Sequence, residues 1–436
     1  MSKVLIATTP VTGHVRPALP LARELVASGH EVTWYAGTSY AAQVRATGAT
    51  FRPVVRGLDY DDVRRPRPAR PARSSVGQIR WDLVHLFLRP VPGFVTDLEQ
   101  LVDDVRPDVV VSDSAFLAGP YTAERTGLPS VIYSQSPMMQ SSVDAAPFGL
   151  GLRPSPTPLG RARNRSLNWA VREVVFREAH QFASAQRGEL GLPPLAGFFM
   201  DWPHQLVERV IHQTVPELEY PRRDLPANLE FTGALLPTGT REELLPAWWP
   251  DLTRSGRRVV VVTQGTVATD PRKLLVPAIT ALAREDVLVV ATTGGPDPEE
   301  VYPEASRPAN LRIERFVPFT ALLPLADVLV TNGGFGGVQT ALANGVPLVT
   351  AGTTEDKIEV NARVAWSGAG ISLRTDTPSP ERLARAVREV LTDPAYRRAG
   401  ELAQSYARLG GARRAAEIVL EAARTARTPV GVGTGR

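Results

Sequence analysis

Short apolar runs alternate with longer helical patterns along nearly the whole chain, and this alternation constrains the fold more than any other feature. One series of runs comprises residues 4–9, 31–36, 108–113 and 130–134, and a second comprises 258–263, 287–291, 311–313, 328–331 and 347–349. Runs of this length that are rich in β-branched residues are typical of strands. The alternation therefore predicts an α/β fold with parallel sheets.

The two series are separated by an interruption with prolines at positions 216, 221, 226, 237, 246 and 250. A chain of 436 residues exceeds one ordinary core and fits two domains of roughly 200 residues each. We therefore expect two doubly wound domains in series, with their boundary in this proline-rich region. Open α/β sheets bind ligands beyond the C-terminal ends of their strands, so the site is predicted in the cleft between the domains.

Composition excludes several other classes of protein. The chain has no cysteine, which rules out disulfides and thiolate metal sites. A net charge of +4 is small for this size, and the densest basic stretch, 64–73, alternates Arg with Pro and Ala without aromatic rings. That stretch favours a solvated loop over a nucleic-acid site. No apolar run reaches the ~20 residues of a membrane span. Because the chain starts with a predicted strand and no signal peptide, we expect a cytoplasmic protein that binds neither nucleic acid nor membranes.

The turn after the first run, Thr12-Gly13-His14-Val15-Arg16-Pro17, contains a candidate general base. His14 is expected at the start of a helix predicted over 15–28, where the helix dipole favours the neutral, basic form of an imidazole. A base also needs an orienting partner, and Asp113 ends another strand of the same sheet. His14 alone could be structural, and Asp113 could cap the helix that begins near Ala115. Residue type and position leave both interpretations open.

A glycine-rich turn at 331–337 is the second candidate site, because it follows a predicted strand and opens a predicted helix. Small residues let the backbone approach a ligand, and the start of a helix attracts an anion. Packing alone can also explain such glycines. The candidate contacts in this turn are Asn332, Gly333, Gly334, Gly336 and Gly337.

Two further loops carry candidate ligand contacts. Thr266 follows the first strand of the second series and could contact a phosphate, while Asp356 and Lys357 follow a later strand. A carboxylate at such a position suits sugar hydroxyls, and a solvated helix cap is the alternative. The chain has no His-Glu-x-x-His motif, no P-loop Gly-Lys-Ser/Thr and no Gly-x-Ser-x-Gly turn.

Taken together, these residues make the chain resemble the family 1 UDP-glycosyltransferases, especially bacterial enzymes that glycosylate macrolides, aromatic polyketides and flavonoid-like phenols. The likeness covers nearly the whole length. It depends on Gly-His-Val-Arg-Pro at 13–17, Phe-Val-Pro at 316–318, Asn-Gly-Gly at 332–334, Gly-Val-Pro at 345–347 and Asn-Ala-Arg-Val at 361–364.

The resemblance implies the GT-B fold, in which two Rossmann-like domains face a central cleft. The acceptor-binding domain would span 1–220, a linker 221–252 and the nucleotide-sugar domain 253–410. A last helix at about 411–424 would cross back to the N-terminal domain, followed by a flexible tail at 425–436.

The resemblance also implies an inverting displacement without a metal ion or a prosthetic group, and with a UDP- or TDP-sugar as donor. His14 would deprotonate the acceptor hydroxyl, assisted by Asp113. On the donor side, the family pattern would place Phe316 against the base and backbone groups of Val317 on the edge of the base. Thr266 and Gly334 would lie near the phosphates, Asp356 would hold the sugar hydroxyls, and Gly13 would also contact the donor.

The chain departs from the family pattern at several donor positions. Asn332 stands where the family has His, Gly337 where it has Ser or Thr, and Thr340 where it has an acidic residue. Phe319, after the Val-Pro pair, and Lys357, after Asp356, each stand at a position where the family has Gln. The cation beside Asp356 suggests a donor other than UDP-glucose, such as a TDP-deoxysugar or a sugar acid.

The expected acceptor is a small hydrophobic molecule, bound by a monomer or a homodimer. An apolar pocket for it could be lined by Trp81, His85, Phe87, Met138, Met139, Phe148, Phe199 and Met200, although some of these residues must belong to the core. A Pro- and Ser-rich loop predicted over 137–165 could cover the pocket.

Four alternatives remain. The departures leave open a catalytically inactive homologue that acts as a partner of another enzyme. A Rossmann oxidoreductase would need a Gly-x-Gly-x-x-Gly turn where this chain has Thr-Pro-Val-Thr-Gly-His at 9–14. A GT-B enzyme for lipid-linked acceptors would need an apolar, basic face. The segment 59–61 matches the short Asp-x-Asp metal signature, but it does not follow a strand.

Overall fold

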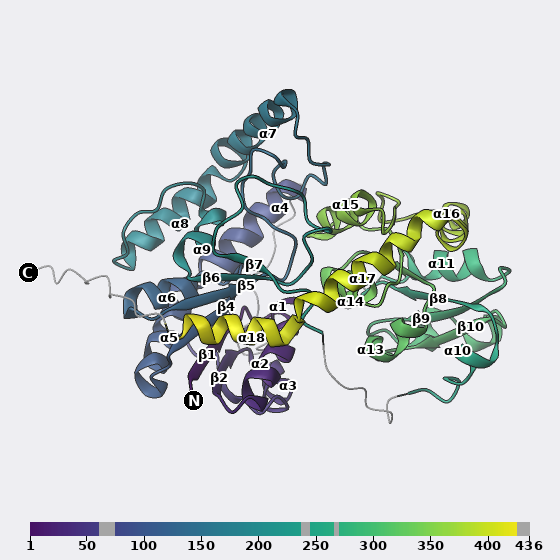
Figure 1. Cartoon of the computed structure of the whole chain (residues 1–436), viewed down its shortest axis with the longest axis horizontal. Helices are drawn as coiled ribbons and strands as arrows, with labels where there is room; N and C mark the ends of the chain where they lie inside the picture. Colours follow the sequence, from purple (N-terminus) through teal and green to yellow (C-terminus); the bar gives the residue numbers. More distant parts are fainter. Residues whose placement is uncertain (61–74, 237–244, 266–269, 425–436) are drawn as a thin grey trace, which may run out of the picture.

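The computed structural model describes residues 1–60, 75–236, 245–265 and 270–424. It consists of two parallel sheets, each with helices on both faces (Figure 1). The N-terminal sheet has seven strands in the order β3-β2-β1-β4-β5-β6-β7, and the C-terminal sheet has six in the order β10-β9-β8-β11-β12-β13. Every neighbouring pair is parallel. The predicted α/β fold with two doubly wound sheets is confirmed.

The elements of the N-terminal half follow the chain in the usual strand–helix alternation. Its strands are β1 (Lys3–Ala7), β2 (Glu31–Ala36), β3 (Thr50–Pro53), β4 (Val109–Asp113), β5 (Ser130–Tyr133), β6 (Arg209–His212) and β7 (Leu229–Phe231). Its helices are α1 (Thr12–Val15), α2 (Ala18–Ala27), α3 (Ala41–Arg45), α4 (Ser75–Asp82), a π-helix (Leu83–Leu88), α5 (Val91–Val105), α6 (Ala118–Thr126), α7 (Pro158–Ala170), a second π-helix (Val171–Val175), α8 (Arg177–Glu189) and α9 (Trp202–Leu206).

The C-terminal half repeats the alternation. Its strands are β8 (Arg258–Thr263), β9 (Val287–Thr292), β10 (Leu311–Glu314), β11 (Val328–Thr331), β12 (Leu348–Thr350) and β13 (Gly370–Ser372). Its helices are α10 (Asp251–Arg254), α11 (Leu275–Leu282), α12 (Pro298–Val301), α13 (Phe319–Leu322), α14 (Phe335–Ala343), α15 (Lys357–Ser367), α16 (Pro380–Thr392), α17 (Arg398–Leu409) and α18 (Gly411–Ala422). Among the described residues, no helix combines the length and apolar character needed to cross a bilayer.

The central strands are apolar throughout because each strand contributes side chains to the hydrophobic cores on both faces of its sheet. Successive side chains of a strand point to opposite faces of the sheet. In β1, Leu5 belongs to the core on one face, and Val4 and Ile6 belong to the core on the other. In β8, Val261 and Val262 are divided between two cores in the same way. The unbroken apolar runs of the sequence therefore follow from burial on both faces.

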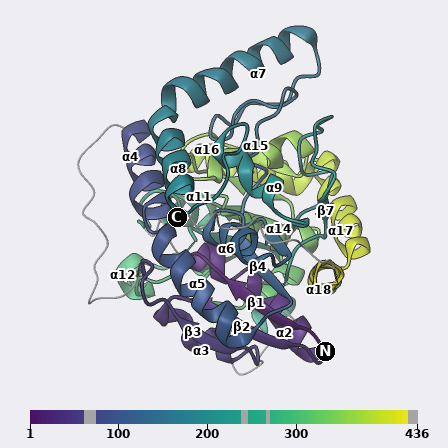
Figure 2. The same ribbon diagram turned by 90° about the vertical axis from the view of Figure 1, so that its left-hand side faces the viewer.

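The last two helices cross from one half of the molecule to the other. Helix α17 packs on α14 of the C-terminal half, and α18 packs on α2 and β6 of the N-terminal half (Figures 1 and 2). The helices meet at Gly410 and Gly411, whose φ angles of 84° and 54° lie in the left-handed region that glycine adopts without strain. Ile418 and Val419 of α18 are fully buried in the same core as Val4 and Ile6.

Several predicted boundaries differ from the structure. The expected linker at 221–252 contains β7, an edge strand of the N-terminal sheet, which is too short to produce a recognisable pattern. The helix predicted over 15–28 is divided into α1 and α2, because Pro17 has no N–H to continue the hydrogen-bond ladder. The loop predicted over 137–165 ends earlier, because Thr157 Oγ1 accepts a hydrogen bond from Gly160 N (3.0 Å) and caps α7. The basic stretch 64–73, residue 61 and the tail 425–436 lie outside the described residues.

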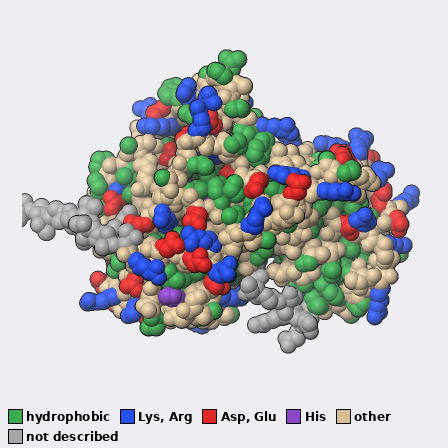
Figure 3. Space-filling model, in the orientation of Figure 1, with side chains coloured by type: hydrophobic (Ala, Val, Ile, Leu, Met, Phe, Trp, Pro, Cys, Tyr) green, Lys and Arg blue, Asp and Glu red, His purple; other side chains and the backbone are tan. Residues whose placement is uncertain are grey.

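On the face that carries α18, Lys and Arg side chains are mixed with Asp and Glu and do not form one basic surface (Figure 3). Arg414 of α18 shows the pattern, because it pairs with Glu230 of β7 and with Glu417 and Glu421 of its own helix. The pair with Glu230 ties the crossing helix to the edge strand of the N-terminal sheet.

The packing of α18 predicts that Ile418, although it lies near the end of the chain, stabilises the N-terminal half. Ile418→Ala should lower the free energy of unfolding by about 2–5 kcal/mol, because it leaves a cavity in a closed core. Urea denaturation followed by tryptophan fluorescence measures the change. Arg413→Ala, at an exposed position of the same helix, is the control and should stay within ~0.5 kcal/mol of wild type. Equal stability of the two variants would contradict this account of the crossing helix.

Candidate active site

The candidate residues gather where the strand order reverses in each sheet. In the N-terminal sheet, β1 and β4 are neighbours although they are not consecutive, and in the C-terminal sheet β8 and β11 have the same relation. The connections after such strands diverge to opposite faces, so the carboxyl ends leave room for a ligand. His14 follows β1, Asp113 ends β4, and Asn332 follows β11.

His14 and Asp113 form a hydrogen-bonded pair. The distance from His14 Nδ1 to Asp113 Oδ1 is 2.8 Å, and the side chains are 15% and 0% exposed. Because a carboxylate only accepts, the ring proton is assigned to Nδ1, which leaves the Nε2 lone pair available as a base. Asp113 also accepts from Thr9 N (2.8 Å) and from Ala115 N (3.1 Å), so it caps the following turn and orients the imidazole at the same time.

The backbone of His14 is held by a third residue. Tyr133 of β5 donates its hydroxyl hydrogen to the His14 carbonyl oxygen at 2.6 Å. Burial, followed by the charge of Asp113, raises the pKa of Tyr133 well above its ordinary value, so the phenol remains a donor. One expectation is corrected here: His14 lies near the end of the single-turn helix α1, so it does not receive the dipole of a long helix.

An aromatic ring lies close to His14. Phe87 lies 6.2 Å from His14 between ring centroids, and His85 stacks on Trp81 at 4.4 Å. Trp81 packs in a small cluster with Tyr60 and Phe87. Trp81, His85 and Phe87 come from α4 and the π-helix that continues it, and they form one wall, of which Phe87 lies next to the imidazole.

The other expected acceptor residues divide into two groups. Met138 is buried, while Met139 and Phe148 are half-buried, all in the segment that follows β5. Phe199 belongs to the main core of the N-terminal half, and Met200 packs against that core. Phe199 is therefore a core residue, because an apolar side chain in a stretch without periodicity can belong to a core or to a pocket.

Three glycines of the turn after β11 have no packing role. A β-carbon added at Gly336 or Gly337 would have no protein atom within 4 Å, and one at Gly334 would approach only Asn332 Oδ1, at 3.9 Å. Gly333 differs, since its φ is +94° and an added β-carbon would lie 1.8 Å from Asn361 Oδ1. Packing therefore explains Gly333 alone. The first turn of α14 leaves the amides of 335–337 without acceptors inside the helix, where an anion would be stabilised.

Asn332 and Lys357 line one pocket together with Gln264, but both side chains are already engaged. Asn332 Nδ2 donates to the Gln264 carbonyl oxygen, and Gly334 N donates to Asn332 Oδ1 at 3.3 Å. Asn332 thus ties the loops after β8 and β11 together. The Lys357 ammonium is buried and pairs with Glu355. Local spacing could not show which acidic residue this ammonium would pair with.

Asp356 is the N-cap residue of α15 and is half-buried. Burial raises the pKa of Asp356 to about 6, Lys357 opposes this rise, and Glu355 adds to it. A smaller contribution comes from His14, which belongs to the other half of the molecule. Asp356 begins a helix of the C-terminal half, and His14 follows the first strand of the N-terminal half.

The remaining donor-side candidates are placed as follows. Phe316 is 58% exposed in the loop after β10, which leaves an aromatic ring open to a flat partner, and Val317 is buried in the C-terminal core. Gly13 is exposed in α1, and an added β-carbon there would meet no atom within 4 Å. Thr266 lies outside the described residues.

Sequence reasoning missed several residues that shape this site. Tyr133 holds the backbone of His14, and Asn361 Nδ2 donates to the carbonyl oxygens of Asn332 (3.2 Å) and Gly352 (2.9 Å). The end of the β5 run could have indicated Tyr133, because strands adjacent to β4 end at the same edge. The Asn-Ala-Arg-Val motif contains Asn361, but no local pattern shows that it braces the turn at 332–333.

Comparisons with known proteins agree with this geometry. Residues 278–410 match the profile of the erythromycin biosynthesis protein CIII-like C-terminal domain. The chain is 44% identical over 409 residues to 4'-demethylrebeccamycin synthase of Lentzea aerocolonigenes, covering 93% of this chain and 96% of that protein. It is 33% identical over 422 residues to UDP-glycosyltransferase 2 of Phaeomoniella chlamydospora, covering 92% of both. The solved structure of the glycotransferase of kitacinnamycin superposes with a TM-score of 0.72 at 26% identity, covering 97% and 98% of the two chains.

Together with the two parallel sheets, these relatives identify a glycosyltransferase of the GT-B class that uses nucleotide sugars. The chain belongs to the family 1 glycosyltransferases, among those of antibiotic and natural-product biosynthesis.

The pKa of Asp356 predicts a pH-dependent gain in stability for Asp356→Asn. An acid whose pKa is raised in the folded state stabilises the fold fully below its unfolded pKa, near 4, and loses that contribution as the pH rises through about 6. The variant should therefore be more stable than wild type at pH 8, and the difference should disappear towards pH 4. Urea denaturation at several pH values tests this, with the exposed Asp103→Asn as control. A loss of stability at pH 8 would show that the carboxylate is stabilised by its surroundings.

Proposed function

We propose that the enzyme transfers a sugar from a UDP- or TDP-sugar to a hydroxyl group of a small natural-product acceptor, with inversion at the anomeric carbon and with His14 as general base. The observation that carries this proposal is the His14–Asp113 pair, whose 2.8 Å bond leaves Nε2 as the free basic atom. The retained pair argues against an inactive homologue.

In the proposed reaction, the acceptor hydroxyl attacks the anomeric carbon while its proton passes to His14 Nε2. The bond from the anomeric carbon to the phosphate oxygen breaks, and the nucleoside diphosphate leaves with the electron pair from the opposite face. Asp113 stabilises the imidazolium that forms, because its carboxylate is already bonded to Nδ1. General-base assistance of this kind contributes roughly 10²–10⁴-fold. Alignment and stabilisation of the leaving diphosphate supply the remainder.

On the donor side, the exposed ring of Phe316 supports stacking on the nucleobase, and the amides at the start of α14 support binding of the diphosphate. Asp356 would accept hydrogen bonds from the sugar hydroxyls. These groups suit a displacement without a metal ion or a prosthetic group. The cation of Lys357 beside Asp356 favours a donor other than UDP-glucose, such as a TDP-deoxysugar or a sugar acid.

On the acceptor side, the wall formed by Trp81, His85 and Phe87 supports an apolar acceptor with a flat ring system, because aromatic faces stack on such rings. One relative is a 4'-demethylrebeccamycin synthase, and residues 278–410 match an erythromycin biosynthesis profile, so both matches concern natural-product enzymes. Phenolic, polyketide and macrolide compounds with a free hydroxyl are therefore the first acceptors to test.

The test is mass spectrometry of the protein incubated with pooled acceptors of these three classes and with UDP- and TDP-sugars separately. An acceptor mass raised by one sugar residue identifies the donor and the acceptor together. His14→Ala should lower the turnover number by about 10²–10⁴-fold. Asp113→Asn should lower it as well, since an amide nitrogen facing Nδ1 disfavours the required tautomer. His30→Ala, a histidine bonded to Ser2 N and placed away from the site, is the matched control. Wild-type turnover by His14→Ala would refute the assignment of the base.

A further inference from the structure

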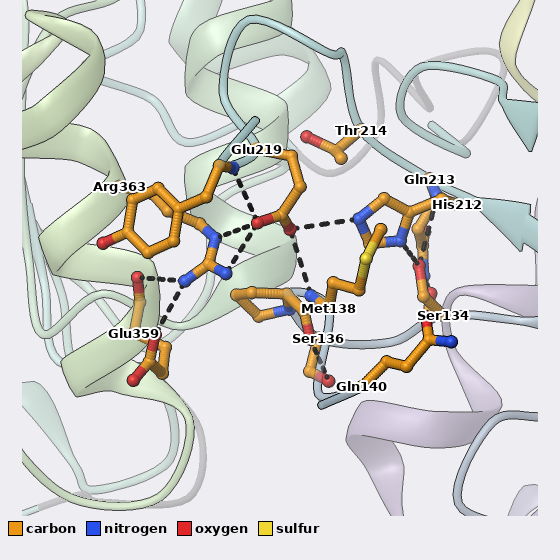
Figure 4. Close-up of polar contacts among 12 residues, drawn as sticks. Ser134, Ser136, Met138, Gln140, His212, Gln213, Thr214, Glu219, Glu359 and Arg363 are labelled. Carbon is orange, nitrogen blue, oxygen red and sulfur yellow. Dashed lines mark hydrogen bonds and ion pairs between the residues drawn. The ribbon is translucent and has the colours of Figure 1, made fainter. Parts of the chain in front are cut away.

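A chain of buried charges joins the two halves of the molecule (Figure 4). Arg363 of α15 donates from Nε to Glu219 Oε1 at 2.7 Å and from Nη1 to Glu359 Oε2 at 2.8 Å. The three side chains are 2–5% exposed. Glu219 belongs to the region after β6, whereas Arg363 and Glu359 belong to the C-terminal half. The proposed reaction uses none of these groups.

Both carboxylates of this cluster contact the same guanidinium. Burial would raise the pKa of Glu219, but Arg363 and then His212 lower it well below its ordinary value, so Glu219 remains a carboxylate. The guanidinium also lies 4.1 Å from the ring centroid of Tyr220. Buried ion pairs are costly to form and costly to break when one partner is removed. Such a cluster is therefore a rigid connection, with one arrangement strongly preferred.

Both carboxylates extend this connection to the segment between β5 and α7, residues 134–157, which we call the β5–α7 segment. Glu359 Oε1 accepts from Gly149 N at 2.9 Å and from Gly151 N at 2.7 Å. Glu219 Oε2 accepts from Met138 N at 3.0 Å. The segment is thus held near its start by Glu219 and in its second half by Glu359.

The segment also packs closely on the beginning of α15. Gly151 has a φ of +57°, and a β-carbon added there would lie 2.7 Å from Ile358 Cγ1 and 3.1 Å from the Ile358 carbonyl oxygen. Contact this close leaves no room for the segment to shift towards the helix. A displacement of the first turn of α15 would therefore move the segment with it.

Helix α15 thereby connects the donor side with the acceptor side. Its N-cap is Asp356, and Lys357 lines the pocket that contains Asn332, whereas Glu359 one turn later holds the β5–α7 segment. The segment leaves the sheet directly after Tyr133, which holds the carbonyl of His14. A nucleotide sugar that fixes the start of α15 would also fix this segment beside the base.

We propose that Glu359 is a positioning residue that couples the binding of the nucleotide at α15 to the placement of the β5–α7 segment beside the acceptor. The proposal rests on the proposed function for the role of Asp356 and for the acceptor side of the N-terminal half. Glu359 does not touch the reacting atoms. It acts through the amides of Gly149 and Gly151.

The test compares wild type with Glu359→Gln by hydrogen exchange, measured by mass spectrometry on peptides that span 145–153, with and without UDP and TDP. The neutral amide loses the ion pair with Arg363 and weakens both bonds to the segment, so exchange should become about tenfold faster. Nucleotide should add protection to these peptides in wild type and not in the variant. Glu401→Gln, an exposed glutamate paired with Arg398, is the control and should behave as wild type.

A kinetic measurement separates positioning from general stability. Glu359→Gln should raise the KM for the acceptor several-fold and lower the ratio of transfer to donor hydrolysis, with hydrolysis itself retained. Parallel loss of both activities, or wild-type exchange at 145–153 in every condition, overturns the proposal. If Glu359→Gln does not fold, the same exchange measurement is made on Gly151→Ala. This variant keeps all charges in place, and its added methyl group displaces the β5–α7 segment from Ile358. Wild-type protection by nucleotide in Gly151→Ala then overturns the proposal.

The exchange experiment also distinguishes this proposal from the proposed function. It uses only UDP or TDP as probe and needs no acceptor. Normal transfer that depends on His14, without coupling in the exchange data, refutes the role of Glu359 alone. Coupling in the exchange data, with wild-type transfer by His14→Ala, refutes the assigned base and leaves the role of Glu359 standing.

Discussion

The parallel arrangement of every strand is the constraint on which the rest of this structure depends. When all strands of a sheet run in one direction, they all end at one edge, and the connections diverge at the point where the strand order reverses. The pair His14 and Asp113 exists because β1 and β4 end side by side. The same constraint brings the loops after β8 and β11 together, where Asn332 ties them to each other. Neither site needs residues that are close in sequence.

A reaction at two such edges requires that the two halves keep a defined relation to each other. Two different interactions supply it. Helix α18 contributes apolar side chains to the core of the N-terminal half, and this contribution is nondirectional. The hydrogen-bonded ion pairs of Arg363 are directional, because the planar guanidinium donates its hydrogen bonds in fixed directions. The first interaction holds the halves together, and the second defines how the segment after β5 lies against α15.

The sequence predicted the fold class and the pair at the first site well, and the physical reason is the same in both cases. Strands buried on both faces leave long apolar runs, and the residues at the ends of these runs must meet at the sheet edge. Thus His14 and Asp113 could be placed together without a structure. The partner of Lys357 could not be predicted, since Glu355 is only one of several acidic residues within reach of a flexible side chain. The bonds from Glu359 to Gly149 and Gly151 join segments about 210 residues apart, and no local pattern records them. Strand β7 was not predicted, because three residues are too few to show the alternation of a strand.

The crossing of α17 and α18 has a consequence for building chimeric enzymes. Each half of the molecule looks like a separate module, yet the N-terminal module is completed by the last helix of the chain. A hybrid made by a single exchange in the region of 221–252 would have the N-terminal half of one parent and α18 of the other. A compatible exchange needs a second junction at Gly410 and Gly411, so that α18 comes from the same parent as β1 and α2. In this architecture, a chimera that combines the donor specificity of one enzyme with the acceptor specificity of another needs two junctions in the chain.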